Sequence, residues 1–360
     1  MNEKKMRVAI IGQGRSGRDI HGRFFQSAEN EFCEVVCVVE ADADRRARAR
    51  EEYGCDTAAD YTELFARKDI DVVVNATYSH MHYAITKDLL SHGFSVLCEK
   101  PLARTLYECE DLILTAKRKG VVLAVFHQSL LNPAFLKIKE IIGSGKLGNV
   151  IQINLKYSGF ARRWDWQTLQ CCCAGGLYNT GPHPLGQALD LLEWDPNVRV
   201  AFSSLHTVLT SGDSDDYAKV ILTAPGRPNV DVEVISADAY AGDYTFKIYG
   251  SGGTLTATNS AYKMKYIEDF SVYPARPVQK GFLSKPDGMP LYCSEKLRFT
   301  EEAGDISGTS FDVAVKDFYA MLYRAVMNGE ALDIPAERAA QVIAVVEYCH
   351  AQNPLPVKFD

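Results

Sequence analysis

A short apolar run that ends in a glycine-rich turn constrains this chain more than any other feature. Residues 8–17 read Val-Ala-Ile-Ile-Gly-Gln-Gly-Arg-Ser-Gly, and a helical pattern follows from Arg18. In a strand–turn–helix unit the first glycine permits the turn, the second lets the backbone approach phosphates, and the third allows close helix packing. The helix N-terminus then offers free N–H groups to an anion. The pattern predicts a dinucleotide site formed by Gly12, Gln13, Gly14, Arg15, Ser16 and Gly17.

An acidic residue after the next strand pattern supports the same interpretation. Residues 32–39 form a second buried-strand pattern, and Glu40 follows it. Glu40 stands roughly 20 residues beyond the glycines, where an acid accepts hydrogen bonds from a ribose. A carboxylate there disfavours a 2′-phosphate, so NAD is expected in preference to NADP. The nearby arginines, Arg45 among them, leave NADP possible, and a solvated turn residue is the alternative reading of Glu40.

Composition limits the classes of protein to which the chain can belong. Its 360 residues suffice for two domains, and its formal charge of −7 argues against a nucleic-acid partner. No apolar run reaches the roughly 18 residues of a membrane span, and no signal peptide is expected before the first strand. Ten cysteines without paired spacing predict reduced thiols and a cytoplasmic protein. The run at 171–173 has diverging side chains, so no metal site is predicted.

The order of strand and helix patterns predicts two α/β domains. Over residues 1–130 strands alternate with helices, which indicates a doubly wound parallel sheet of the Rossmann type. Over residues 131–360 several strand patterns follow one another without helices, which indicates a large open, mainly antiparallel sheet. Residues 270–309 are rich in Pro, Gly and Ser and are expected to form loops. Two helices are expected to close the chain, one from residue 311 and one around residues 339–346.

Two further motifs resemble those of a known family. Cys98-Glu99-Lys100-Pro101-Leu102 follows a predicted strand, with Asn-Ala-Thr at 75–77 upstream, and residues 175–183 read Gly-Gly-Leu-Tyr-Asn-Thr-Gly-Pro-His. Together they resemble the Gfo/Idh/MocA family of oxidoreductases, and the likeness covers essentially the whole chain. The resemblance implies a second domain whose open sheet backs the substrate and often the subunit interface. It therefore implies a homo-oligomer, a dimer or a tetramer.

The resemblance assigns the catalytic roles to three residues. Lys100 is implied to lie between the nicotinamide ribose and the substrate, where an ammonium group stabilises a developing alkoxide. His183 is implied to be the general acid/base, because an imidazole titrates near neutral pH. Asn179 stands where relatives commonly have an acid, and its amide can orient a substrate hydroxyl but cannot take its proton. A surface lysine and a helix-capping histidine are the alternatives.

Other residues are expected around the cofactor and the substrate. Further positions of this chain depart from the family pattern, since Gly186 replaces a common Asp, and Gln128 and Ser129 replace Asn and Arg. The loop after the strand at 71–75 resembles a nicotinamide-facing loop, although its histidines could equally be ordinary helix N-terminal residues. The expected cofactor contacts beyond the glycine loop and Glu40 are Ala76, Thr77, His80, His82, Glu99, Lys100 and Gln128. The expected substrate contacts are Lys100, Tyr157, Trp164, Trp166, Asn179 and His183, with packing between domains as the alternative for the tryptophans.

The sequence therefore predicts an NAD(P)-dependent oxidoreductase that acts on a polyol, a sugar or a sugar derivative. Two other functions remain open at this point. One is cleavage of a glycosidic bond through transient oxidation, with no net consumption of the cofactor. The other is a non-catalytic dinucleotide-binding regulator, which the amide at Asn179 would suit.

Overall fold

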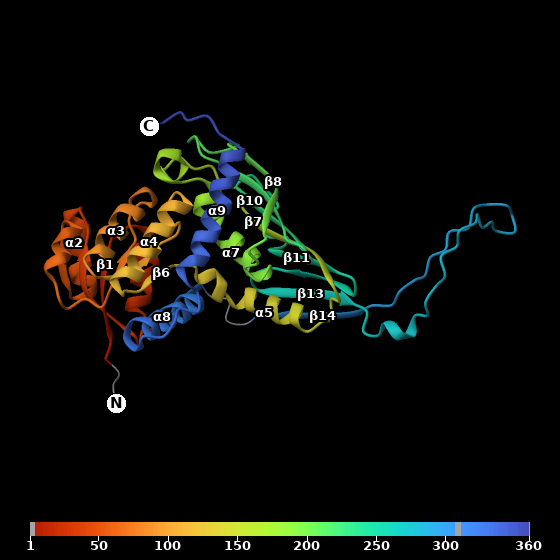
Figure 1. Ribbon diagram of the computed structural model, residues 1–360, viewed down its shortest axis with the longest axis horizontal. Helices are drawn as coiled ribbons and strands as arrows, with labels where there is room; N and C mark the ends of the chain where they lie inside the picture. Colours follow the sequence, from red (N-terminus) through yellow and green to blue (C-terminus); the bar gives the residue numbers. More distant parts are fainter. Residues whose placement is uncertain (1–3, 307–310, 360) are drawn as a thin grey trace.

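Two β-sheets organise the molecule, and helices fill the space between and around them (Figure 1). The computed structural model describes residues 4–306 and 311–359. Among these residues, no helix combines the length and the apolar character needed to cross a bilayer. Both predicted sheets are present, so the predicted fold class is confirmed.

Sheet A holds six parallel strands in the order β3-β2-β1-β4-β5-β6. Its strands are β1 (Met6–Ile11), β2 (Cys33–Val39), β3 (Asp56–Ala58), β4 (Val72–Asn75), β5 (Ser95–Cys98) and β6 (Leu123–Val125). The central strands are buried along almost their whole length, which explains their continuous Val and Ile runs. The strand order reverses between β1 and β4, and ligands of doubly wound sheets bind at such a switch point.

The helices of this layer begin and end largely where the sequence signals them. They are the π-helix η1 (Arg15–Gly22), α1 (Arg23–Gln26), α2 (Ala43–Tyr53), α3 (His82–Ser91) and α4 (Leu106–Lys119), with short 3-10 turns at η2 (Tyr61–Ala66) and η3 (Ser79–Met81). Thr105 and Glu108 form the expected capping box of α4, and Gly120 ends it with φ +67°. The first helix starts at Arg15, three residues before the position at which its pattern becomes visible.

Sheet B is the eight-stranded sheet in the order β14-β13-β12-β11-β7-β10-β9-β8. Its strands are β7 (Val150–Ser158), β8 (Arg199–His206), β9 (Tyr217–Thr223), β10 (Asn229–Ile235), β11 (Phe246–Gly250), β12 (Gly253–Ala257), β13 (Ala261–Tyr266) and β14 (Thr300–Asp305). The pair β7–β10 is parallel and the other neighbouring pairs are antiparallel, which matches the predicted mainly antiparallel sheet.

One part of the loop prediction for residues 270–309 is wrong. Residues 300–305 form β14, which pairs with β13 at the edge of sheet B. The β14 sequence Thr-Glu-Glu-Ala-Gly-Asp has no apolar alternation, because an edge strand needs little apolar surface. Its partner lies more than thirty residues earlier, so no hairpin signal marks the pair. The strand β13 also went unpredicted.

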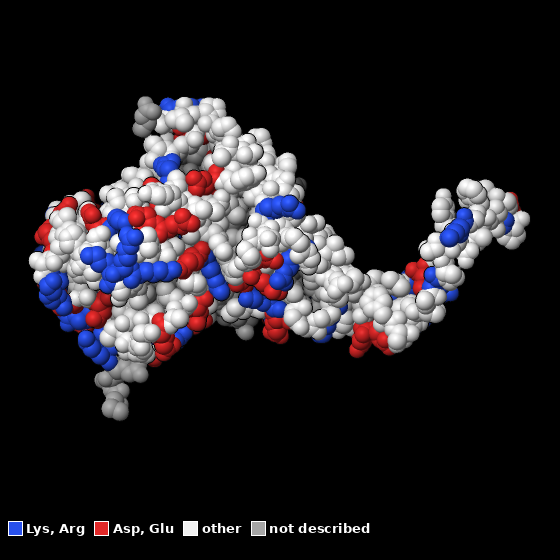
Figure 2. Space-filling view, viewed as in Figure 1, with Lys and Arg blue, Asp and Glu red and all other residues white. Residues whose placement is uncertain are grey.

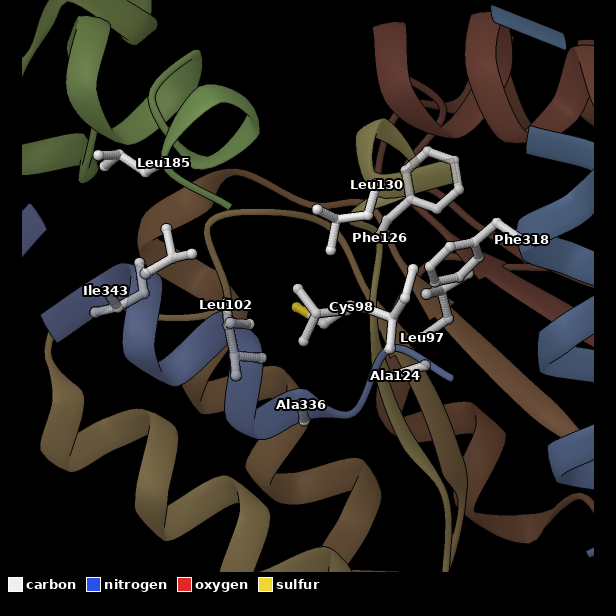
Figure 3. Packing of buried hydrophobic residues seen from close by; sticks show 14 of the residues in the cluster. Leu97, Cys98, Leu102, Ala124, Phe126, Leu130, Leu185, Phe318, Ala336 and Ile343 are labelled. Atoms are coloured by element: carbon white, nitrogen blue, oxygen red, sulfur yellow. The ribbon is translucent and has the colours of Figure 1, made fainter. Parts of the chain in front are cut away.

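The closing helices connect the two sheets. The remaining helices are α5 (Pro133–Gly143), α6 (Gly176–Asn179), α7 (Pro182–Leu191), α8 (Phe311–Asn328) and α9 (Ala336–Gln352), with 3-10 turns η4 (Gln128–Leu131), η5 (Trp166–Thr168), η6 (Gln170–Cys172) and η7 (Phe270–Val272). Phe318 of α8 packs edge-on against Phe126, and the Tyr319 ring stacks on Phe24 with 4.7 Å between centroids. Figure 3 shows this junction, where Leu97, Phe318 and Ile343 come from β5, α8 and α9. Both closing helices thus pack against sheet A.

Candidate active site

The glycine turn after β1 leaves room for a ligand at one of its three glycines. Gly12 has φ +96°, and a Cβ there would lie 2.6 Å from the Ala76 carbonyl oxygen. A Cβ on Gly17 would lie 1.9 Å from the Gly12 carbonyl oxygen. A Cβ on Gly14 would meet no heavy atom of the described chain within 4 Å. Gly12 and Gly17 are therefore required by the fold, whereas Gly14 leaves open space of the kind a bound phosphate uses.

A cavity of about 570 Å³ begins at this turn and runs along the carboxyl ends of the sheet A strands. It brings together most of the residues that the sequence predicts. Of the predicted site residues, its lining includes Gly12, Gly14, Arg15, Ser16, Glu40, Ala76, Thr77, His82, Glu99, Lys100, Gln128, Trp166 and His183. Gln13, Gly17, His80, Tyr157, Trp164 and Asn179 do not line it.

Glu40 lines the cavity at the glycine-turn end, and two backbone N–H groups hold its carboxylate in place. Its Oε2 accepts the Gln13 N–H at 2.8 Å, and its Oε1 accepts the Asp42 N–H at 3.0 Å. The Arg45 guanidinium lies 3.9 Å from Oε2, while Arg46 donates to the carbonyl oxygens of Glu40 and Ala41. A fixed carboxylate beside the glycine turn is suited to accept hydrogen bonds from ribose hydroxyls. The Arg46 guanidinium is already hydrogen-bonded to backbone carbonyl oxygens.

A chain of buried polar side chains supports the turn that carries Lys100. Glu99 Oε2 accepts the Lys100 backbone N–H at 3.0 Å, and Glu99 Oε1 contacts His21 Nε2 at 3.2 Å. His21 Nδ1 contacts the Tyr319 hydroxyl at 2.7 Å. Burial alone raises the pKa of Glu99, but the hydrogen bond from His21 and the nearby positive charges lower it to about 2. No motif in the sequence marks His21 as part of the site, and only the fold brings it to Glu99.

Lys100 lies in the cavity with its ammonium group held by one backbone acceptor. Its Nζ donates to the Asn179 carbonyl oxygen at 2.7 Å, and the Lys100–Pro101 peptide bond is cis. Burial lowers the pKa of Lys100, while the Glu99 carboxylate opposes this shift. Asn179 was predicted to act through its amide, but that amide donates to the Gln167 carbonyl oxygen at 2.9 Å. In this structure Asn179 fixes Lys100 through its main chain.

His183 lines the cavity from the first turn of α7. Its Nδ1 lies 3.1 Å from Ser129 Oγ, and no side chain caps α7. Burial and the positive charges of Lys100 and His127 lower the pKa of His183 well below its usual value of 6.5. The imidazole is therefore neutral at pH 7. If Nδ1–H donates to Ser129, the Nε2 lone pair is free to accept a proton.

The other predicted histidines and Gln128 differ in what they can offer a ligand. His82 is buried with Nδ1 at 2.7 Å from the Pro101 carbonyl oxygen and Nε2 at 3.1 Å from that of Thr77. His80 is exposed and stacks on Tyr78. Gln128 is buried, and its Oε1 lacks a hydrogen-bond partner among the described residues. This orphaned amide oxygen in the cavity lining fits an amide donor such as that of a nicotinamide.

An aromatic and polar loop from sheet B covers the cavity beside Lys100. Trp166 packs edge-on against Tyr78 with 4.9 Å between ring centroids, and it lines the cavity with Arg163, Asp165 and Gln167. Trp164 is 79% exposed and lies outside the lining. Tyr157 donates to Gln187 Oε1 at 3.1 Å and lines a second cavity of about 360 Å³. Of the predicted ring-stacking residues, only Trp166 is thus in position to contact a ligand in the first cavity.

A buried acidic run between β8 and β9 holds the segment that carries His183, and sequence reasoning missed it. Asp215 Oδ2 accepts the Leu177 N–H at 2.7 Å, and burial raises the pKa of Asp215 to about 7. The Asp216 carboxylate accepts three successive backbone N–H groups from residues 208–210. Asp213 accepts the Gln170 N–H. Four polar residues in a row, Asp-Ser-Asp-Asp, indicate a solvated turn, and only tertiary contacts reveal their burial.

Two family models match this chain. The family model described as "Oxidoreductase family, NAD-binding Rossmann fold" matches residues 6–127, and the "GFO/IDH/MocA C-terminal domain" matches residues 135–256. This chain belongs to the Gfo/Idh/MocA family. The recognition made from the motifs at 98–102 and 175–183 is confirmed, and the chain is an NAD-binding Rossmann oxidoreductase by family.

Individual relatives are distant. The scyllo-inositol 2-dehydrogenase (NADP(+)) of Bacillus subtilis is 25% identical over 348 residues, which cover 95% of this chain and 92% of that protein. An uncharacterized oxidoreductase of Schizosaccharomyces pombe is 29% identical over 69% of each chain. A levoglucosan dehydrogenase solved with NADH and levoglucosan superposes with a TM-score of 0.74 at 19% identity, over 99% of this chain and 100% of that one. The structural match supports the fold alone.

Proposed function

We propose that this chain transfers a hydride between a nicotinamide cofactor and a hydroxyl-bearing carbon of a polyol, a sugar or a sugar derivative. The observation that carries the proposal is that Lys100 and His183, 83 positions apart, line the same cavity as the glycine turn. Similarity to an inositol dehydrogenase over 95% of this chain supports the substrate class. Arg163, Asp165 and Trp166 offer polar groups and a flat ring to such a ligand.

In the proposed reaction the chain itself transfers the proton and stabilises the charge on the substrate oxygen. The bound nicotinamide supplies the carbon that accepts or returns the hydride. His183 Nε2 takes the proton of the substrate hydroxyl during oxidation and returns it during reduction, so that one hydride and one proton leave together. The Lys100 ammonium group donates a hydrogen bond to the same oxygen and stabilises its developing negative charge. The low pKa of His183 keeps it in the proton-accepting form at neutral pH.

The same geometry favours NAD over NADP in this proposal. The Glu40 carboxylate, fixed by two backbone N–H groups, would repel a 2′-phosphate and accept ribose hydroxyls. Gly14, which leaves open space, would face the pyrophosphate, and Gln128 Oε1 would accept the carboxamide N–H. Arg45 lines the cavity 3.9 Å from Glu40 Oε2, and it would have to leave Glu40 to bind a phosphate.

The test is a substrate panel followed by absorbance at 340 nm. Purified protein receives NAD or NADP with scyllo-inositol, myo-inositol, levoglucosan or common aldoses, and Lys100→Met is run beside it. Turnover with at least one hydroxyl compound, lost in Lys100→Met while cofactor affinity stays within a few-fold, is the expected result. Release of an aglycone from a glycoside without net change in cofactor would indicate transient oxidation instead. Tight cofactor binding with no turnover on any compound would contradict the proposed reaction and point to a regulator.

A further inference from the structure

Two adjacent thiols meet on the loop between η5 and α6. In η6 the Sγ atom of Cys171 lies 3.9 Å from the Sγ atom of Cys172. Cys171 is exposed and Cys172 is half-buried, whereas Cys173 is buried. The prediction that the side chains of this run diverge is therefore wrong for the first two cysteines. They form a dithiol that solvent reaches and that the proposed reaction does not use.

The other cysteines compete poorly for an oxidant. Six of the ten are buried, and burial raises the pKa of Cys98, Cys173 and Cys349 to about 12. A thiol with so high a pKa is protonated at pH 7, and the thiolate is the nucleophile. Among the described residues, which include all ten cysteines, no other two thiols are hydrogen-bonded to each other. Oxidation to a disulfide is therefore expected at this pair.

Arg104 joins the pair to the turn that carries Lys100. Arg104 stands four positions after Lys100, directly before the capping residue of α4. Its Nη1 donates to the Gln170 carbonyl oxygen at 3.1 Å, and its Nη2 donates to the Cys171 carbonyl oxygen at 2.8 Å. Its own carbonyl oxygen accepts the Tyr178 hydroxyl at 2.8 Å. Because hydrogen bonds from a charged donor are the stronger ones, Arg104 fastens the backbone of η6 to the sheet A layer.

The backbone next to the pair also lines the cavity. Trp166 and Gln167 of η5 belong to the lining. The Gln167 carbonyl oxygen accepts the Gly175 N–H at 3.2 Å and the Asn179 side-chain amide at 2.9 Å. Asn179 in turn holds the Lys100 ammonium group through its main-chain oxygen. Since η6 lies between Gln167 and Gly175, a change in its backbone shifts residues that line the cavity.

Oxidation of the pair by a hydroperoxide balances without any further reactant. The exposed Cys171 thiolate attacks one peroxide oxygen, which leaves a sulfenic acid on Cys171 and releases an alcohol or water. Burial raises the pKa of Cys172, so this residue enters as a thiol. Its sulfur displaces the hydroxyl group of the sulfenic acid, which takes up the Cys172 proton and leaves as water. In sum two thiols lose two electrons and two protons, and the hydroperoxide is reduced.

The bond requires the peptide group between the two cysteines to turn. The Cα atoms of neighbouring residues lie about 3.8 Å apart, whereas disulfides usually span about 4.4–6.8 Å. The carbonyl of this peptide group is the Cys171 oxygen that accepts from Arg104. Formation of the bond therefore acts on the hydrogen bond that fastens η6 to the sheet A layer.

We propose that Cys171 and Cys172 are a modification site for hydroperoxides, and that their oxidation to a disulfide draws the Cys171 carbonyl away from Arg104 and loosens the loop that lines the cavity. The proposal rests on the NAD-binding fold and not on the proposed reaction, because its readout is cofactor affinity. A thiol reductant reverses the modification.

The first experiment locates the bond. Reduced full-length protein is treated with hydrogen peroxide, unfolded, alkylated and analysed by peptide mass spectrometry. Two of the ten thiols should escape alkylation, and dithiothreitol should restore both. Cys171→Ser and Cys172→Ser should form no such bond, whereas Cys173→Ser should still form it. In Cys172→Ser the Cys171 sulfenic acid should persist and react with dimedone.

The matched control for the site is Cys293→Ser. Cys293 is the other exposed cysteine of the chain, and it lies on residues 270–299 between β13 and β14. This segment extends away from the body of the molecule in Figure 1 and Figure 2. Cys293→Ser should form the same bond as the native chain, at the same rate.

The second experiment measures NADH affinity by fluorescence titration of the reduced and the oxidised protein. Oxidation should raise the dissociation constant at least about tenfold, the equivalent of one lost hydrogen bond from a charged donor, and dithiothreitol should reverse the change. Peroxide-treated Cys171→Ser should stay within about twofold of its reduced form. Arg104→Gln should weaken NADH binding to a similar extent while reduced, and oxidation should then add little. Thermal unfolding of each variant checks that the chain still folds.

Three outcomes would overturn the proposal. The first is full alkylation after peroxide treatment, and the second is a disulfide that joins other cysteines or two copies of the chain. The third is a bond between Cys171 and Cys172 that leaves NADH affinity unchanged.

Discussion

Alanine substitutions at Gly14 and Gly17 should separate cofactor binding from folding. Gly14 has φ −79° and ψ −162°, a conformation that alanine adopts readily, and its Cβ would have free space. Gly14→Ala should therefore stabilise the free protein by about 0.4–1 kcal/mol, because it restricts the unfolded chain. The same methyl group would stand where the pyrophosphate approaches. The dissociation constant for NADH should rise at least tenfold, which corresponds to about 1.4 kcal/mol.

Gly17→Ala should instead lower the stability of the folded protein. Its Cβ would lie 1.9 Å from the Gly12 carbonyl oxygen, so the backbone of the turn must shift. Such overpacking costs about 1–3 kcal/mol or more. With an unfolding entropy of roughly 2.1 cal/mol/K per residue, a chain of 360 residues loses about 1.3 °C in Tm for each kcal/mol. The loss should appear without any cofactor present.

The assay combines thermal unfolding of the cofactor-free protein with fluorescence titration of NADH. Gly143→Ala is the matched control, since a Cβ at Gly143 also meets no heavy atom of the described chain within 4 Å and the residue lies on α5, outside the cavity lining. It should leave the NADH affinity unchanged. Unaltered NADH binding in Gly14→Ala would refute the argument that this open space holds the cofactor.

Three further outcomes follow from the site. Since the pKa of His183 is held well below 6.5, the rate of alcohol oxidation should stay constant as the pH falls from 8 to 6.5, and a decline centred near pH 6.5 would contradict this assignment. His183→Asn should lower the oxidation rate about 10²–10⁴-fold. Glu40→Gln should raise the NADP-to-NAD ratio of kcat/KM at least tenfold, and an unchanged ratio in initial-rate assays would remove Glu40 from cofactor selection. The folded-state pKa of Asp215, about 7, exceeds its usual 3.8, so the contribution of this carboxyl to stability is present at low pH and declines as the pH rises through 7. Asp215→Asn should therefore gain stability relative to the native chain between pH 5 and pH 8 in urea unfolding, and equal shifts at both pH values would exclude this carboxyl as the cause.

Local signals in the sequence predict sheet A and the cofactor end of the site. The glycine turn, Glu40 and the capping box of Thr105 and Glu108 each specify their own geometry within a few residues. The motif around Lys100 is also local. It directly follows β5, so Lys100 lies at the carboxyl edge of sheet A, where the cavity runs. Local geometry of this kind can be read from spacing alone.

The parts that the sequence did not predict depend on distant contacts. Tyr319 contacts His21, which in turn contacts Glu99, only because α8 returns to sheet A, nearly three hundred residues after the glycine turn. The run at 213–216 has the composition of a solvated turn but is buried under the segment of His183. The hydrogen bond from Lys100 to the main-chain oxygen of Asn179 likewise joins residues that are 79 positions apart. No periodicity or motif reports such pairings.

The most direct test of the central claim asks whether Lys100 and His183 act on one reacting oxygen. Single-turnover hydride transfer is measured by stopped-flow absorbance at 340 nm, with saturating cofactor and the best substrate from the panel, for the native chain, Lys100→Met, His183→Asn and the double variant. Residues that act as a unit give strongly non-additive losses. The double variant should therefore be little slower than the slower single variant. A double variant whose loss equals the product of the two single losses would show that the two side chains act independently, and it would contradict the proposed mechanism.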